Sequence, residues 1–140
     1  MQEILKNETE EKVYSTLDKL NIKYDRVDHE PVFTAEEAKS CVTGLIKGVR
    51  CKNLFLQDTK KNYYLYFITD TKKADLKFLR DQINSTRLSF ASEEKLYEML
   101  KLTKGSVTPL GVYLIKITKI QMFFYTHNLT QLLYLLNTAI

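Results

Sequence analysis

Two strand-like segments joined by a short polar turn place the strongest constraint on the fold of this chain. Residues 53–57 (NLFLQ) and 63–69 (YYLYFIT) are rich in aromatic and branched residues, whereas residues 58–62 between them are polar. This arrangement is typical of a β-hairpin. The second segment is apolar on both faces, so we expect it to be a central, buried strand of a sheet.

Hydrophobic spacing and capping residues predict five helices around this hairpin. The helices are expected over residues 7–20, from the capping box at 34–37 towards 41, over 75–83, from Ser92, and after Asn128. Other short strands are expected over residues 22–28, over 87–90 and within 112–124, with loops over 43–50 and 101–110. Helices and strands mix without strict alternation, which predicts an α+β fold: a single domain over residues 1–140 with a mixed β-sheet flanked by helices.

The composition suits a compact protein. The chain has 140 residues, of which 44% are hydrophobic, and it contains only four glycines and two prolines. Such a chain can bury a core of its own. Its N-terminal segment is acidic and lacks the apolar core of a signal peptide, and no apolar run approaches the ~20 residues of a membrane span. We therefore expect a soluble, cytoplasmic protein that does not associate with membranes.

Charge is distributed unevenly along the chain. Residues 1–37 carry a net charge of −5, and residues 38–140 carry a net charge of +9. The basic part can present a positive face to a polyanion such as RNA. The alternative is that its lysines form an ordinary solvated surface, and charge alone does not decide between the two.

Most familiar catalytic motifs are absent from the sequence. It contains no P-loop, dinucleotide-binding glycine run, HExxH motif or GxSxG motif. The two histidines, His29 and His127, and the two cysteines, Cys41 and Cys51, are not spaced as a zinc site or a redox pair. We expect two unreactive thiols, and neither a cofactor nor a metal.

Four segments, in their order and spacing, resemble one known family. They are residues 29–37 (HEPVFTAEE), 52–58 (KNLFLQD), 87–94 (RLSFASEE) and 105–111 (GSVTPLG). Together they resemble the bacterial aminoacyl-tRNA editing domains related to the insertion domain of prolyl-tRNA synthetase. Within that family, the branch that they resemble most is the free-standing alanyl-tRNA(Pro) deacylases.

The resemblance implies an activity as well as a fold. Prolyl-tRNA synthetase cannot fully exclude alanine, because a missing methylene or two gives only ~1–3 kcal/mol of discrimination. A second site then hydrolyses the mischarged ester, and it must admit alanine and reject the bulkier proline. The implied partner is the acceptor end of mischarged tRNA(Pro), and prolyl-tRNA synthetase itself is a further candidate partner.

The family pattern assigns a role to the start of the predicted hairpin. Lys52 matches a near-universal lysine that is thought to engage the terminal adenosine or its phosphates, which suits a cation beside a strand. Without the resemblance, Lys52 would be interpreted as a surface lysine. Asn53 either orients the acceptor end or satisfies nearby backbone groups.

Gly105 and Pro109 match a GxxxP loop of the family. A glycine lets the backbone approach a ligand closely, and a proline stiffens the loop. Such a loop can offer backbone groups to the ester carbonyl or to a water. Val107 is a substrate-binding candidate within it, and Ser106 and Thr108 are either ligands of the substrate or caps of the loop.

The HEPVFT segment supplies the remaining candidates. His29 is a candidate general base or an exposed structural histidine. Val32, Phe33 and Thr34 are expected to line the small amino-acid pocket, although Phe33 taken alone would be interpreted as a core residue.

We predict hydrolysis without a protein nucleophile, with Lys52, Gly105 and Ser106 as the catalytic group. Aminoacyl esters are already activated, so positioning a water and stabilising the developing oxyanion can suffice. The ribose hydroxyl of the tRNA is a candidate assistant. An acyl-enzyme formed on a cysteine or a serine would contradict this mechanism.

Residues 112–140 depart from the family pattern. This segment contains no acidic residue, and Leu133 stands where a histidine commonly precedes the closing Asn-Thr-Ala of the family. His127 lies ten positions before Asn137, so its role is open. The segment either completes the core or packs against a partner chain, which leaves a homodimer open.

Three other functions remain open from the sequence. One is a sister activity on another mischarged tRNA, such as cysteinyl-tRNA(Pro). A second is a catalytically silent tRNA-binding or regulatory module, which would bind tRNA with a steep salt dependence and release no amino acid. A third is an interaction domain that does not bind RNA.

Overall fold

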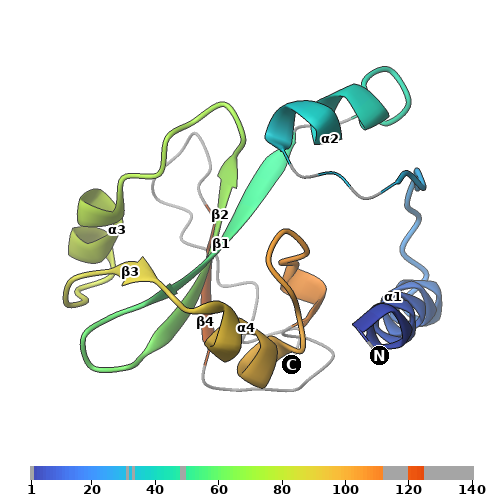
Figure 1. Ribbon diagram of the computed structural model, residues 1–140. Coiled ribbons are helices and arrows are strands. Elements are labelled where there is room, and N and C mark those ends of the chain that lie inside the picture. The colour runs from blue at the N-terminus through green and yellow to red at the C-terminus, as the bar shows by residue number, and fades with distance from the viewer. Residues whose placement is uncertain (1, 31, 33, 48–49, 112–119, 125–140) are drawn as a thin grey trace. The chain divides into compact units, whose positions relative to one another are not determined.

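The structure is a computed structural model that describes residues 2–30, 32, 34–47, 50–111 and 120–124 (Figure 1). The chain divides into two compact units, Met1–Val49 and Arg50–Ile140. Among the described residues, the first unit contains two helices, and the second contains the sheet with two further helices. The predicted extent of one domain over residues 1–140 stays a prediction.

The first unit contains helix α1 (Gln2–Lys19) and helix α2 (Ala35–Val42). Helix α1 begins five residues before the predicted start. The predicted capping box of α2 is confirmed: the Glu37 backbone N–H donates to Thr34 Oγ1 (3.1 Å), and the Thr34 N–H donates to the Glu37 carboxylate (3.2 Å). These two bonds satisfy backbone donors that a helix start leaves without a partner inside the helix.

The predicted strand over residues 22–28 is wrong, because this segment is irregular. The alternating pattern serves a different contact: the Tyr24 ring stacks on the Tyr14 ring at 5.6 Å, and the Arg26 guanidinium lies 4.3 Å from the Tyr14 ring centroid. A strand forms only where another strand can satisfy its backbone groups. The described part of the first unit contains no strand, so the alternation turns these side chains onto α1 instead.

The second unit is built on a four-stranded mixed sheet with the strand order β3-β1-β2-β4. The strands are β1 (Cys51–Gln57), β2 (Tyr63–Thr69), β3 (Ser89–Phe90) and β4 (Ile120–Phe124). β1 pairs antiparallel with β2 and β3, and β2 pairs parallel with β4. The predicted hairpin and the central position of its second strand are confirmed, as is the α+β class with a mixed sheet flanked by helices.

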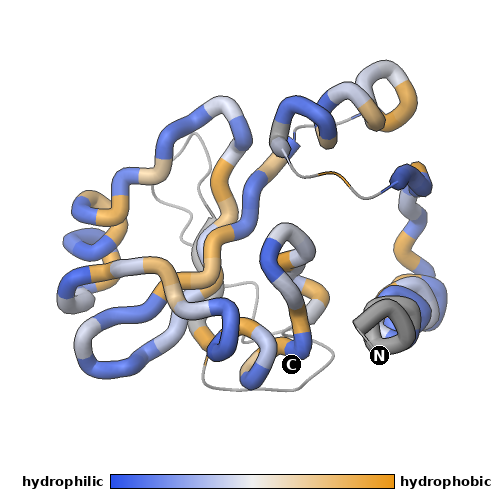
Figure 2. The backbone as a smooth tube through the Cα atoms, viewed as in Figure 1, coloured by the Kyte–Doolittle hydropathy of each residue, from blue (hydrophilic) through white to orange (hydrophobic). Residues whose placement is uncertain are grey.

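β2 is central because both of its faces carry core residues. One face contributes to a cluster formed by Phe55, Tyr63, Leu65, Phe67, Leu96, Leu100, Leu102 and Ile120. The other face contributes to a cluster formed by Leu56, Tyr64, Tyr66, Ile68, Leu79 and Leu88. Figure 2 shows hydrophobic residues along both hairpin strands and hydrophilic residues in the turn that joins them. Alternation along one strand therefore fills two core layers.

Each face of the sheet is covered by one capped helix. Helix α3 (Leu76–Gln82) contributes to the second cluster and begins at Asp75, whose carboxylate accepts the Phe78 N–H at 2.9 Å. Helix α4 (Glu93–Leu100) contributes to the first cluster and begins at Ser92, whose hydroxyl accepts the Lys95 N–H at 3.2 Å. The two predicted helices and the predicted N-cap at Ser92 are confirmed, and Asp75 is a further N-cap, because short polar side chains satisfy the first backbone donors.

Smaller differences from the predictions concern element ends. β3 covers only residues 89–90 of the predicted 87–90, and the predicted loop over 101–110 ends in a helical turn that begins at Pro109. Proline suits such a start, because its fixed φ favours the first helical position. β4 bears out the expected strand within 112–124, whereas the predicted helix after Asn128 lies outside the described residues.

Asp58 fixes the turn between β1 and β2. Its carboxylate is buried and accepts hydrogen bonds from the backbone N–H groups of Lys60 and Asn62, both at 2.9 Å. It also accepts from the Asn62 amide (2.9 Å), the Tyr64 hydroxyl (3.0 Å) and the Ser85 hydroxyl (3.2 Å). Burial alone would raise the pKa of Asp58, but these hydrogen bonds lower it to about 2. The turn is therefore tied both to β2 and to the segment before β3.

We predict that Asp58→Asn destabilises the protein by about 2 kcal/mol at pH 7, because buried donors lose their acceptor. The pKa of Asp58 is lower in the folded state than in the unfolded chain. Its stabilising contribution is therefore present above pH ~4 and is lost as the pH falls towards 2. Urea unfolding of both proteins between pH 2 and pH 7 measures this difference, which should shrink with falling pH. Asp81→Asn, on the exposed face of α3, is the control, and a pH-independent difference would contradict the assignment.

Candidate functional site

The start of β1 lies at an edge of the described sheet. β3 pairs only with Leu56 and Gln57, so no described strand covers residues 51–54 on that side. The Arg50 carbonyl oxygen accepts the Asp70 N–H on the β2 side of the strand, and the Phe55 carbonyl oxygen accepts the Ala91 N–H on the β3 side. Since these directions alternate along an antiparallel strand, the backbone of Asn53 faces the open edge.

Lys52 and Asn53 lie on opposite faces of this edge. Lys52 is half-buried, stands opposite Ile68 and shares its face with Leu54 and Leu56 of the second cluster. Asn53 stands opposite Phe67, on the face covered by α4. The side chains of Lys52 and Asn53 therefore lie on opposite sides of the strand, because successive side chains of a β-strand point to opposite faces.

Asn53 joins the strand to the predicted GxxxP loop. Its side-chain amide donates a hydrogen bond to the Val107 backbone oxygen at 2.7 Å, in a half-buried position. Two segments of the family pattern, 52–58 and 105–111, thus meet in space. Of the two roles weighed for Asn53, the structure supports satisfaction of a backbone group, but that group is 54 residues away rather than local.

The loop also closes on itself through Ser106. The Ser106 hydroxyl donates to the Thr103 carbonyl oxygen (2.8 Å) and accepts the Thr103 backbone N–H (3.2 Å). The Ser106 backbone N–H donates to the same carbonyl oxygen (3.0 Å). Gly105 lies between them with φ +87°, a conformation that glycine adopts without strain. Thr103 was not among the predicted site residues, although a Thr-x-x-Ser spacing is a signal for such a local turn.

The exit of the loop is equally constrained. Thr108 accepts the Leu110 N–H on its hydroxyl (3.3 Å) and the Gly111 N–H on its carbonyl (3.2 Å). A Cβ at Gly111 would come within 2.8 Å of Leu102, which belongs to the core. The backbone N–H groups of Gly105 and Val107 make no hydrogen bond to another backbone group within the described residues.

The other candidates belong to the first unit. His29 is exposed, and its Nδ1 lies 2.7 Å from the Glu30 carbonyl oxygen. Val32 is half-buried, and Thr34 caps α2. Phe33 lies outside the described residues, as do residues 112–119 and 125–140, which contain His127.

Two kinds of site do not occur in the described part of the chain. No group of three histidine, cysteine or acidic side chains there is placed to hold a metal ion. Within the same residues, no helix is both long enough and apolar enough to span a bilayer.

Comparison with known proteins identifies the family. Residues 29–124 match the aminoacyl-tRNA editing domain. The prolyl-tRNA editing protein ProX of Acetoanaerobium sticklandii is 42% identical over 113 residues, which are 80% of this chain and 68% of that protein. Prolyl-tRNA synthetase associated domain-containing protein 1 is 37% identical in Danio rerio and 39% identical in Mus musculus. The aligned regions are 70% and 67% of this chain, and they span only 53% and 57% of those relatives.

Two solved structures share the fold at low sequence identity. The crystal structure of hypothetical protein APE2540 superposes with a TM-score of 0.65 and 17% identity, over 81% of this chain and 72% of that one. A scaffold from epitope backbone grafting by computational design superposes with a TM-score of 0.60 and 18% identity, over 86% of this chain and 98% of that one.

The chain belongs to the aminoacyl-tRNA editing domain family. Editing of an aminoacyl-tRNA is hydrolysis of the ester that joins the amino acid to the terminal ribose. The protein is therefore an aminoacyl-tRNA deacylase, and tRNA is its substrate.

We predict that Asn53→Ala loosens the loop between Thr103 and Thr108. Loss of the bond to Val107 should lower the free energy of unfolding by about 1 kcal/mol and speed amide hydrogen exchange in this loop. Asn53→Asp is the matched variant, because its carboxylate cannot donate at pH 7 but its protonated form can. The defect of Asn53→Asp should therefore shrink below pH ~4. Unchanged exchange in both variants would contradict the clamping role of Asn53.

Proposed function

We propose that this protein hydrolyses alanyl-tRNA(Pro) in trans, by positioning a water at the aminoacyl ester without a protein nucleophile. The observation that carries the proposal is the hydrogen bond from Asn53 to Val107, which joins the strand edge beside Lys52 to the loop that contains Gly105. The names of the relatives, which refer to prolyl-tRNA editing and to a prolyl-tRNA synthetase associated domain, support tRNA(Pro) as the substrate.

The terminal adenosine is proposed to lie along the open edge of β1. On one face, the long flexible stem of Lys52 brings a cation to a phosphate of the acceptor end. On the other face, the loop held by Asn53 receives the aminoacyl ester. The strand edge lies between the phosphate contact and the ester contact. Lys52 and Asn53, on opposite faces of the strand, can therefore contact different parts of one extended substrate.

The chemistry requires only addition of water and departure of the ribose. Water attacks the ester carbonyl, negative charge develops on the carbonyl oxygen, and the bond to the ribose oxygen then breaks, giving alanine and uncharged tRNA. The backbone N–H groups of Gly105 and Val107 are proposed to stabilise that oxygen, as donors fixed in advance do in other acyl-transfer sites. Ser106 is proposed to act by closing the loop, because its hydroxyl and its N–H already bond to Thr103.

Selectivity for alanine is proposed to come from a small amino-acid pocket to which Val32, Phe33 and Thr34 contribute, with His29 as a further substrate contact. A small pocket rejects proline by steric exclusion, and it separates alanine from cysteine only weakly, because one added atom changes the binding energy by about 1–3 kcal/mol. Cysteinyl-tRNA(Pro) is therefore the second candidate substrate. A cytoplasmic location, docking to prolyl-tRNA synthetase and a homodimer are further parts of the proposal.

We predict rapid deacylation of alanyl-tRNA(Pro) and little deacylation of prolyl-tRNA(Pro). Lys52→Ala should reduce kcat/KM for the alanyl substrate by about 100-fold, the range expected when one electrostatic contact of an acyl-transfer site is lost. Release of labelled amino acid from alanyl-, cysteinyl- and prolyl-tRNA(Pro) measures both effects.

Lys77→Ala is the matched control for this experiment, because Lys77 is an exposed lysine on α3. It should retain wild-type activity. Binding of tRNA without hydrolysis of any of the three substrates would overturn the proposal in favour of a silent binding module.

We predict that Ser106→Ala retains hydrolysis, reduced by about tenfold or less, because the hydroxyl only closes the loop on Thr103. In water enriched in ¹⁸O, one labelled oxygen should enter the released alanine in a single turnover. An acyl group trapped on Ser106 by acid quench would instead identify a protein nucleophile, and loss of activity as large as that of Lys52→Ala would show that the hydroxyl does more than close the loop.

A further inference from the structure

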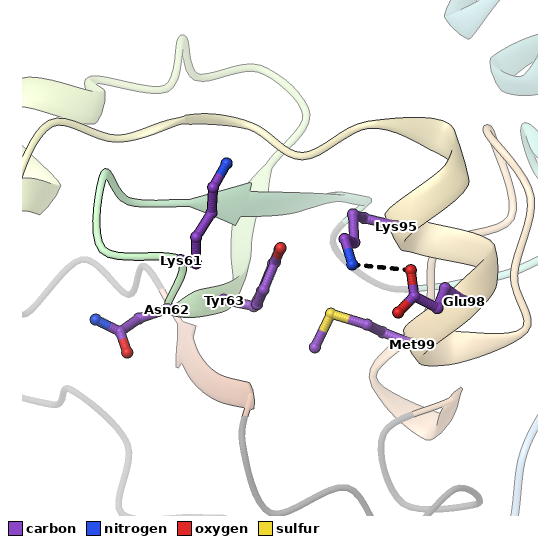
Figure 3. A pocket seen from close by; sticks show the side chains of 6 residues that line it. All are labelled: Lys61, Asn62, Tyr63, Lys95, Glu98 and Met99. Atoms are coloured by element: carbon purple, nitrogen blue, oxygen red, sulfur yellow. Dashed lines mark hydrogen bonds and ion pairs between the residues drawn. The ribbon is translucent and has the colours of Figure 1, made fainter.

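A pocket lies at the hairpin end that is remote from Asn53. It has a volume of about 450 Å³ and lies between the β1–β2 turn and α4. Its lining residues are Lys61, Asn62, Tyr63, Lys95, Glu98 and Met99. Figure 3 shows the Tyr63 hydroxyl pointing into the space between Lys61 and Lys95. The lining thus combines two cationic side chains and a tyrosine hydroxyl with the apolar side chain of Met99.

The charges of this lining favour an anion. Lys95 forms an ion pair with Glu98 at 2.8 Å, which raises the pKa of Lys95. Lys61 is exposed and has no ion pair within the described residues. The lining therefore carries one net positive charge, to which the neighbouring Lys60 of the same turn adds a second.

The turn presents Lys61 in a fixed and unusual conformation. Lys61 has φ +64°, a region that favours glycine or asparagine over residues with longer side chains. Asp58 holds the residues on both sides through its bonds to the N–H groups of Lys60 and Asn62. The hydrogen bonds of Asp58 thus hold the backbone on both sides of Lys61, so the turn keeps the lysine at one place beside the pocket.

The pocket also lies on the same sheet face as the loop of the candidate site. Tyr63 stands opposite Gln57, four residues along β1 from Asn53, which corresponds to about 14 Å of strand. Helix α4, which packs on this face, exposes Tyr97, and the Lys101 Nζ lies 5.3 Å from the centre of its ring. Cations interspersed with an accessible aromatic ring are the pattern of a surface that follows single-stranded nucleic acid.

We propose that this pocket binds a phosphodiester group of the single-stranded 3′ end of the substrate tRNA, upstream of the terminal nucleotide. Lys61 and Lys95 contact the phosphate oxygens, and the Tyr63 hydroxyl donates to one of them. Glu98 competes with the phosphate for Lys95 and so limits affinity. This inference rests on the proposed function only in taking tRNA as the ligand, because phosphate recognition does not depend on which amino acid is removed.

The test measures the affinity of the full chain for uncharged tRNA(Pro), by fluorescence anisotropy at several salt concentrations. Lys61→Asn is the main variant, since asparagine tolerates the positive φ and should leave thermal stability equal or higher. It should weaken binding by about fivefold to tenfold at 50 mM salt and reduce the slope of log K against log salt by about 0.7. Glu98→Gln should tighten binding, because it releases Lys95 for the phosphate.

Lys77→Asn removes the same charge from α3, on the other side of the sheet, and should leave binding unchanged. Equal weakening by Lys61→Asn and Lys77→Asn would overturn the proposal, because it would reveal only a general effect of charge. Adenosine 5′-monophosphate is the second probe. Binding of this nucleotide that depends on Lys61, with tRNA affinity unaffected, would assign the pocket to a free nucleotide and also overturn the proposal.

Failure of the proposed function remains distinguishable from failure of this inference. Deacylation assays report on the editing site, whereas uncharged tRNA reports on the pocket whether or not hydrolysis occurs. In active protein, Lys61→Asn should act mainly by raising KM for alanyl-tRNA(Pro), whereas Lys52→Ala should also lower kcat.

Discussion

The structure of the second unit depends on the burial of β2 on both of its faces. Tyr63, Leu65 and Phe67 enter one core cluster, while Tyr64 and Tyr66 enter the other. Because each face removes apolar surface from water, the strand requires a helix above and a helix below it, and α3 and α4 supply them. The remaining strands extend this sheet, and the candidate site is built at its uncovered edge.

The hairpin has two ends, and each is fixed by one polar side chain. At the open end, Asn53 bonds to the Val107 oxygen and holds the loop that contains Gly105. At the turn, the Asp58 carboxylate accepts five hydrogen bonds and fixes the conformation that presents Lys61. Partly buried polar groups bond only in specific geometries, so they position nearby segments more narrowly than apolar packing alone does. Such positioning suits a deacylase whose substrate ester is already activated.

Much of the fold could be predicted, and the failures have a common cause. The hairpin, the capping box of α2, the helix α3 and the N-cap of α4 are confirmed, because each depends on residues that are close in the sequence. Residues 22–28 show the alternation of a strand but have no strand beside them in the described part of the first unit, and the side chains of Tyr24 and Arg26 pack on Tyr14 instead. Alternation describes which side chains share a face, but only a neighbouring strand makes such a segment a β-strand.

Local signals in the chain specified the helix starts, the hairpin and, through the family motifs, the residues to inspect: Lys52, Asn53, Gly105 and Ser106. The assembly of distant segments decided what those residues contact. It brought Asn53 to Val107, turned Lys52 to the opposite face of the strand, and directed the Ser106 hydroxyl to Thr103. Capping and turn formation depend on neighbours within a few residues, whereas a hydrogen bond across 54 residues exists only after the sheet and α4 have packed together.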